Sequence, residues 1–152
     1  MYIAAGADVS CQVIRTLDIV GEKWSLLIVR DLLRGSTRFS EFRTSLGLPT
    51  DVLTARLATL VDRGIVEKRP YREDGARERF SYHLTPAGEG LRIVVAALIQ
   101  WGDEFDPAPK GVASRLVSAD TREPVALGYF GDDGRRVDEV AIVPGPAVVN
   151  PW

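Results

Sequence analysis

The chain has 152 residues, of which 45% are apolar, a formal net charge of −2 and a single cysteine. Its length is typical of one globular domain with a small appendage, and its near-neutral charge argues against a protein that coats nucleic acid indiscriminately. The lone Cys11 excludes an internal disulfide framework and a zinc site built from several thiolates. With neither a signal-peptide pattern nor an apolar run of the roughly 20 residues that cross a bilayer, we expect a cytoplasmic protein without metal or cofactor.

Two helices are predicted in the first quarter of the chain, after residues 1–9, which we expect to be loose. Val13, Leu17 and Val20 recur at helical spacing, and this first helix ends at Gly21. The next stretch, from Trp24 to Leu33, is apolar over most of a helical circumference. We therefore expect the second helix at the centre of the core.

The stretch 39–63 predicts two helices joined by a tight turn. Phe39, Phe42 and Leu46 have the spacing of one buried helical face, and Gly47-Leu48-Pro49 must then turn the chain. We expect Thr50 to cap the second helix of the pair, which ends at Gly64. Its outward-facing residues are predicted to be Asp51, Thr54, Ala55, Arg56, Ala58 and Thr59. This arrangement is that of a helix-turn-helix unit, although a simple αα-hairpin has the same pattern.

After Gly64 the apolar period changes from about 3.6 to 2. Residues 65–69 and 80–84 suit two strands, and the polar loop between them turns at Asp74-Gly75. A helix-turn-helix followed by such a hairpin is the winged-helix arrangement. Arg72, Arg77 and Arg79 of the wing would then touch the DNA backbone or the minor groove. The alternative is a solvated hairpin whose arginines only offset neighbouring acids.

Thr85 and Pro86 predict the start of a long helix that runs to Phe105. Its apolar stripe exceeds what a small winged unit can cover, which indicates packing against a second subunit. From Asp106 onward helical periodicity disappears, and six of the nine prolines lie at 107 or later. Short strands are predicted at 115–118, 124–129 and 137–143, with Asp132-Asp133-Gly134 as a turn.

These elements predict a mainly α protein with a small β wing, in the α+β class. Residues 10–105 form a winged helix-turn-helix domain for DNA binding and dimerisation, and residues 106–152 form a Pro-rich β-strand extension. Residues 38–79 hold nine Lys or Arg against seven Asp or Glu, and the whole chain is near neutral. Any DNA-facing surface must therefore be a local basic patch.

Several sequence blocks, in this order, resemble the HxlR-type winged helix-turn-helix transcriptional regulators, which are MarR-like. The blocks are CQV at 11–13, GEKWSLLI at 21–28, RFSEF at 38–42, LTARL at 53–57, LTPAG at 84–88 and WG at 101–102. They cover about two thirds of the chain, and their number and order make the resemblance specific.

The resemblance implies a homodimer that places two recognition helices in successive major grooves of a pseudo-palindromic, double-stranded DNA operator, roughly 34–36 Å apart. The DNA-facing positions that it implies are Arg38, Thr50, Asp51, Thr54, Arg56, Arg77 and Arg79, to which the hairpin adds Arg72. The expected dimer interface lies on the first and last helices and includes Val13, Leu17, Leu91, Val94, Leu98 and Trp101.

Two residues depart from the family pattern. Asp51 stands where a basic or amide residue is usual, and Ala58 stands where Arg is common. An acidic side chain at position 51 cannot contact phosphate, but it can accept from a cytosine amino group or cap its own helix. These departures keep a second hypothesis open, in which the chain is a winged-helix protein–protein interaction module with lost or weak DNA binding.

Cys11 matches the position of a redox or electrophile sensor in some members of the family. The positive end of a helix dipole favours a thiolate at such a site. The alternative is a small buried residue that stays reduced, since Gln12 replaces the usual proline and no second cysteine is present. A sensor here would act through an intersubunit or mixed disulfide or through alkylation, and the effector would be an oxidant or a small molecule.

The sequence does not predict an enzyme. It contains neither a Ser/His/Asp or Cys/His set nor a phosphate-binding glycine loop nor a cluster of metal ligands. His83, the single histidine, is expected to be a surface or packed residue. Trp24 and Trp101 lie at helical spacing with aliphatic neighbours, which favours core or dimer contacts over ligand binding.

Overall fold

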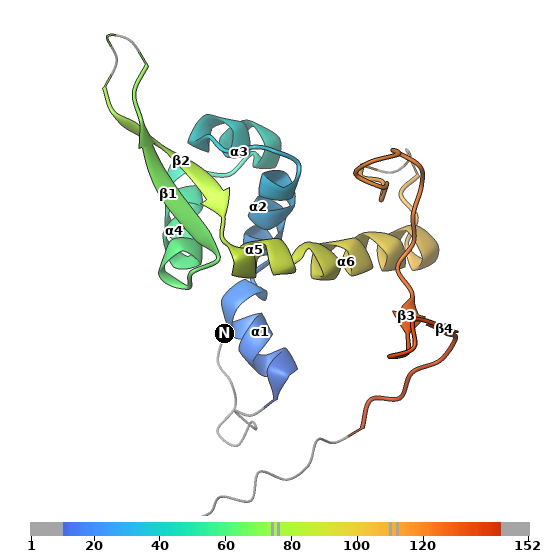
Figure 1. Cartoon of the computed structure of the whole chain (residues 1–152). Coiled ribbons are helices and arrows are strands. Elements are labelled where there is room, and N and C mark those ends of the chain that lie inside the picture. The colour runs from blue at the N-terminus through green and yellow to red at the C-terminus, as the bar shows by residue number, and fades with distance from the viewer. Residues whose placement is uncertain (1–10, 74, 76, 110, 112, 144–152) are drawn as a thin grey trace, which may run out of the picture. The chain divides into compact units, whose positions relative to one another are not determined.

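The computed structural model describes residues 11–73, 75, 77–109, 111 and 113–143. The chain divides into two compact units between residues 95 and 96, and each unit is described by itself. The first contains α1 (Gln12–Val20), α2 (Lys23–Leu33), α3 (Phe39–Leu46), α4 (Thr50–Asp62), β1 (Val66–Tyr71), β2 (Arg79–Leu84) and α5 (Pro86–Gly90) (Figure 1). Helix α6 (Arg92–Phe105) crosses the division, and β3 (Tyr129–Phe130) and β4 (Arg136–Val137) belong to the second unit.

Helix α2 is the centre of the first unit, as its composition predicted. It contacts α1, α3, α4 and β2, and Ile28 and Val29 on it are fully buried. Burying an aliphatic side chain of this size contributes about 1.5–3 kcal/mol, so this helix supplies a large part of the packing energy.

Within the described residues, no helix combines the length and the apolar character that crossing a membrane requires.

The predicted helix-turn-helix is confirmed, with one correction at its turn. Gly47 ends α3 in the left-handed conformation, with φ of 63°, which glycine adopts without steric cost. Thr50 does not cap α4. It is the first residue of the helix, and the capping position is taken by Pro49, whose carbonyl accepts a hydrogen bond from the Leu53 amide. The ring of Pro49 fixes φ, and its ψ of 146° keeps this residue outside the helix.

The hairpin after α4 is also confirmed, and it gives the unit the winged-helix fold. Strands β1 and β2 are antiparallel and pair from Val66 opposite Leu84 to Tyr71 opposite Arg79. The segment before α3 lies along β2, because the Tyr82 amide donates to the Thr37 carbonyl over 2.7 Å and Arg38 forms a β-bridge with Ser81. In Figure 1 the hairpin that β1 and β2 form extends beyond α3.

The single long helix predicted from Pro86 to Phe105 is wrong, because the structure divides it at Leu91. Thr85 caps α5 as expected, with its hydroxyl accepting from the Gly88 amide. The Leu91 amide then bonds to the Gly88 carbonyl three residues back instead of four. Gly88 and Gly90 both weaken an α-helix here, since glycine costs about 1 kcal/mol relative to alanine inside a helix.

In the second unit, the side chain of Gln100 joins α6 to the extension. The Gln100 amide group donates to the Leu127 carbonyl and accepts from the Leu127 N–H, over 3.4 and 2.7 Å. The predicted turn at 132–134 is present between β3 and β4. The strands predicted at 115–118, 124–129 and 137–143 are mostly absent. Val117 and Pro124 form one isolated bridge, Tyr129 and Val137 belong to the two-residue strands β3 and β4, and residues 138–143 form no strand. Strand propensity is insufficient without a neighbouring strand to bond with.

Candidate nucleic-acid interface

The outer face of α4 is polar and exposed near its start, where the sequence predicted base contacts. Thr50, Asp51 and Thr54 are all exposed. The Thr54 hydroxyl donates to the Thr50 carbonyl over 2.7 Å, so its oxygen keeps only acceptor capacity toward a ligand. Asp51 lies in the first turn, where a carboxylate is stabilised by the helix dipole. The same face continues through Ala55, Ala58 and Asp62, which are also exposed.

Arg56 does not face outward as the sequence predicted. It is half-buried on the flank of α4, and Nη2 lies 3.8 Å from Oε2 of Glu22. Its Nε is buried and has no hydrogen-bond partner among the residues that the structure describes. The guanidinium borders a hollow of about 370 Å³ between α4 and the α1–α2 corner. Arg56 therefore lies apart from the exposed Asp51 face of the same helix.

The wing carries the basic surface that α4 lacks. Arg72, Arg77 and Arg79 are exposed, and none of them forms an ion pair with another residue that the structure describes. Arg79 begins β2, and the other two lie between the strands. Charged groups of this kind are free to exchange water and counterions for DNA phosphates. Asp74, which was predicted to turn the hairpin, lies outside the described residues.

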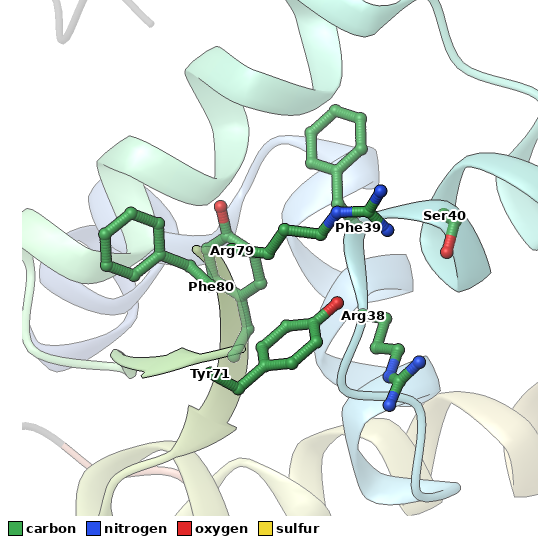
Figure 2. Close-up of a pocket in the computed structure, with 7 residues that line it drawn as sticks. Arg38, Phe39, Ser40, Tyr71, Arg79 and Phe80 are labelled. Atoms are coloured by element: carbon green, nitrogen blue, oxygen red, sulfur yellow. The ribbon is translucent and has the colours of Figure 1, made fainter. Parts of the chain in front are cut away.

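A hollow of about 380 Å³ lies at the base of the wing and brings Arg38 and Arg79 together. Figure 2 shows the side chains that reach it from two elements, the start of α3 and the wing strands. Its other lining residues are Phe39, Ser40, Tyr71, Phe80 and Tyr82. Sequence reasoning found the two arginines and missed the aromatic walls. The signal that could have found them is the alternation of Phe80 and Tyr82 along β2.

Arg38 is held on several sides. Its Nη1 donates to Oε1 of Glu73 over 2.8 Å, and its guanidinium lies 4.9 Å from the centre of the Tyr71 ring. Oε2 of Glu41 accepts from the Thr37 and Arg38 amides over 2.7 and 2.8 Å. These two backbone hydrogen bonds lower the pKa of Glu41, because they favour the charged carboxylate. The segment that presents Arg38 is thus fixed by the first turn of α3.

The predicted dimer residues divide by exposure. Val13 and Leu17 of α1 and Leu98 and Trp101 of α6 are exposed apolar side chains, and the Val13 side chain keeps 65% of its accessible surface. Leu91 and Val94, in contrast, are less exposed, because each is half-buried. The Trp101 ring packs on the Phe105 ring, with centres 5.5 Å apart. Exposed apolar side chains that gather on a helix in this way are typical of surfaces that contact another chain.

Cys11 is half-buried at the capping position of α1, and its side chain makes no capping hydrogen bond. Nε2 of His83 lies 2.9 Å from the Ser81 hydroxyl, and His83 is half-buried in β2. Trp24 is half-buried as well, with the Lys23 ammonium 4.5 Å from its ring centre. Within the described part of the chain, no three His, Cys, Asp or Glu residues gather in a way that could hold a metal ion.

Solved structures share this fold. The crystal structure of PA1607, a proposed transcription factor, aligns with a TM-score of 0.75 and 40% identity over 86% of this chain and 90% of that one. The redox regulator HypR, in its oxidised form, aligns with a TM-score of 0.56 and 32% identity over 62% of this chain and 96% of its own. A MarR-family regulator from Enterococcus faecalis aligns with a TM-score of 0.55 and 30% identity over 68% of this chain and 94% of its own.

Sequence comparison points to the same group. An uncharacterised HTH-type transcriptional regulator of Mycobacterium tuberculosis is 42% identical over 102 residues, which are 67% of this chain and 63% of that protein. This match therefore spans less than two thirds of the relative's length. YdeP of Bacillus subtilis, another HTH-type regulator, is 32% identical over 62% of this chain and 73% of its own. The family model described as HxlR-like helix-turn-helix matches residues 19–109, and the chain belongs to this family of transcriptional regulators.

Proposed function

We propose that this protein is a dimeric transcriptional regulator that binds a pseudo-palindromic DNA operator through α4 and the wing. The observation that carries the proposal is the group of exposed wing arginines, which form no ion pair among the described residues, in a fold whose α4 also begins with exposed, polar residues. Arg72, Arg77 and Arg79 would bind phosphates, and Thr50, Asp51 and Thr54 would approach base edges. In this proposal residues 10–105 bind DNA and dimerise, and 106–152 form an appendage.

The dimer is proposed from the exposed apolar faces of α1 and α6. A twofold axis that pairs these helices would cover Val13, Leu17, Leu98 and Trp101, which an isolated chain leaves in water. The same axis would place two copies of α4 at the spacing of successive major grooves. Size-exclusion chromatography with light scattering should therefore give twice the chain mass, and a monomer at micromolar concentration would contradict the dimer.

Redox or electrophile sensing through Cys11 is a finer part of the proposal. It is supported by the likeness to HypR, described as a redox regulator, and by the partial exposure of Cys11 at the start of α1. Oxidation or alkylation there would alter the end of a helix that we assign to the dimer. Operator affinity should fall after treatment of the wild type with diamide or a quinone, whereas Cys11→Ser should not respond. Equal responses of the two proteins would remove this role.

A second function is favoured by one observation. The exposed face of α4 presents Asp51, Ala55, Ala58 and Asp62, so it carries acids and no base, and Arg56 is turned toward Glu22. A protein-binding winged helix with weak or lost DNA affinity could have this surface.

One experiment separates the two functions. A labelled duplex that covers the promoter region of the protein's own gene is titrated with the full chain, with an unlabelled random duplex as competitor. A regulator should bind the promoter duplex in preference to the competitor and weaken steeply as salt rises. Absence of any retained duplex at low salt would favour the interaction module.

A further inference from the structure

We propose that Glu73 occupies, in the free protein, the position on Arg38 that a DNA backbone phosphate takes in the complex. The inference rests on the proposed function, because its ligand is the sugar–phosphate backbone. It adds a specific role for an acidic wing residue: Glu73 is an internal competitor that sets how tightly the base of the wing binds DNA.

The first support is the geometry at Arg38. Its guanidinium donates to the Glu73 carboxylate over 2.8 Å and lies against the Tyr71 ring. Its backbone is fixed by Glu41 and by the bridge to Ser81. The cation is therefore already oriented, and a carboxylate fills a position that suits a tetrahedral or planar oxyanion.

The second support is a second cation in the hollow that Arg38 lines. Arg79 lines the same hollow as Arg38 and forms no ion pair within the described residues, and the Ser40 hydroxyl lies on the α3 side. The Glu73 carboxylate bonds to Arg38, and Arg79 is a second cation that lines the same hollow as Arg38. A DNA backbone in place of Glu73 could bring phosphates to both arginines, whereas Glu73 supplies one carboxylate.

The third support is the ease of exchange. The Arg38 and Glu73 side chains are 48% and 51% exposed, and exposed ion pairs of this kind are weak. Glu73 follows β1 and lies outside the strand ladder, which ends at Tyr71 opposite Arg79. It can therefore leave Arg38 without breaking a strand hydrogen bond. A phosphate that replaces it also releases counterions from the duplex, which favours the exchange at low salt.

The test compares two substitutions that remove the same charge from the same loop. Glu73→Gln removes the competitor, whereas Glu78→Gln is the matched control, because Glu78 is exposed and has no ion pair among the described residues. Affinity is measured by fluorescence anisotropy on the promoter duplex and on a random duplex of equal length. Glu73→Gln should bind both duplexes about two- to fivefold more tightly than wild type, and Glu78→Gln less than twofold.

Coupling to Arg38 completes the test. In an Arg38→Ala background the effect of Glu73→Gln should shrink to that of Glu78→Gln, because the shared partner is gone. Thermal unfolding of each variant confirms that the wing is intact. Equal effects of the two glutamine variants in both backgrounds, or weaker binding by Glu73→Gln, would overturn the inference and leave the proposed function standing. If no variant, Glu73→Gln included, binds either duplex at low salt, the proposed function itself fails.

Discussion

Nη2 of Arg56 on α4 lies 3.8 Å from Oε2 of Glu22 at the corner between α1 and α2. The flank of α4 therefore lies against the end of α1, one of the two helices that we assign to the dimer. This distance is too long for a hydrogen bond, so the pair attracts weakly and Arg56 can leave it.

Arg56→Ala is expected to lower the free energy of unfolding by about 1 kcal/mol, because the Nε end of its stem is buried against the flank of α4. Glu22→Gln should change it by less than about 0.5 kcal/mol. If the Arg56 guanidinium leaves Glu22 to read a base, Arg56→Ala should weaken the free energy of operator binding by about 1–3 kcal/mol, whereas Glu22→Gln should leave it unchanged. Urea unfolding and anisotropy measure both effects. Equal loss of affinity in Glu22→Gln would show that the pair must stay intact.

The wing arginines should act on every DNA sequence alike. Arg77→Ala is expected to weaken promoter and random duplexes by similar factors and to flatten the slope of log affinity against log salt by about 0.9, the loss of one phosphate contact. Arg135→Ala, which removes an exposed arginine from the extension, serves as the control. A change that is confined to the promoter duplex would assign Arg77 to base reading instead.

The Glu41 carboxylate should make stability depend on pH in the acid range. Its folded pKa is lowered by two backbone hydrogen bonds, so its contribution is complete above the unfolded pKa and is lost as pH falls through the folded pKa. Glu41→Gln should therefore be less stable than wild type by about 1 kcal/mol at neutral pH. Urea titrations at a series of pH values should show the two proteins converging in acid. A constant difference at all pH values would exclude this cause.

Two glycines of α5, Gly88 and Gly90, differ in the space around them and allow the packing at this helix to be tested. A Cβ at Gly88 would lie 2.2 Å from the Ile65 carbonyl oxygen and 2.9 Å from Leu84 Cδ2, whereas a Cβ at Gly90 would meet nothing within 4 Å. Gly88→Ala should lower the free energy of unfolding by about 1–3 kcal/mol, since a backbone oxygen cannot move away cheaply. Gly90→Ala should raise it by about 0.5–1 kcal/mol through the chain entropy of glycine. Thermal denaturation of both variants measures the contrast, and equal effects would contradict the close approach.

The proposed dimer should be sensitive to charge on its apolar faces. Leu17→Glu on α1 and Trp101→Glu on α6 should each shift the protein toward monomer, because an isologous interface buries the new charge twice. Phe130→Glu places the same charge on an exposed ring of β3 and is expected to keep the dimer. Light scattering across a concentration series reports the shift. Dissociation by Phe130→Glu alone would move the interface to the extension.

Local chemistry explains which predictions were confirmed. Three confirmed signals depend only on a few neighbouring residues. They are the turn at Gly47-Leu48-Pro49, the cap at Thr85 and the change of apolar period after Gly64. Such signals need no knowledge of the rest of the fold. The wrong predictions depend on partners: the tail strands needed a neighbour for their hydrogen bonds, and the long last helix was interrupted where two glycines weaken it.

The sequence by itself determined the helix-turn-helix, the hairpin that follows it and hence the winged-helix class, together with the identity of the basic wing residues, because periodicity and turn chemistry are local. Only the tertiary structure decided how the charged side chains are used. Arg38 is joined to Glu73 and Tyr71 across the wing, and Arg56 is turned toward Glu22. Helical spacing fixes the angle at which a side chain leaves its helix, but the element packed on that flank decides whether the side chain meets solvent, an acid or DNA.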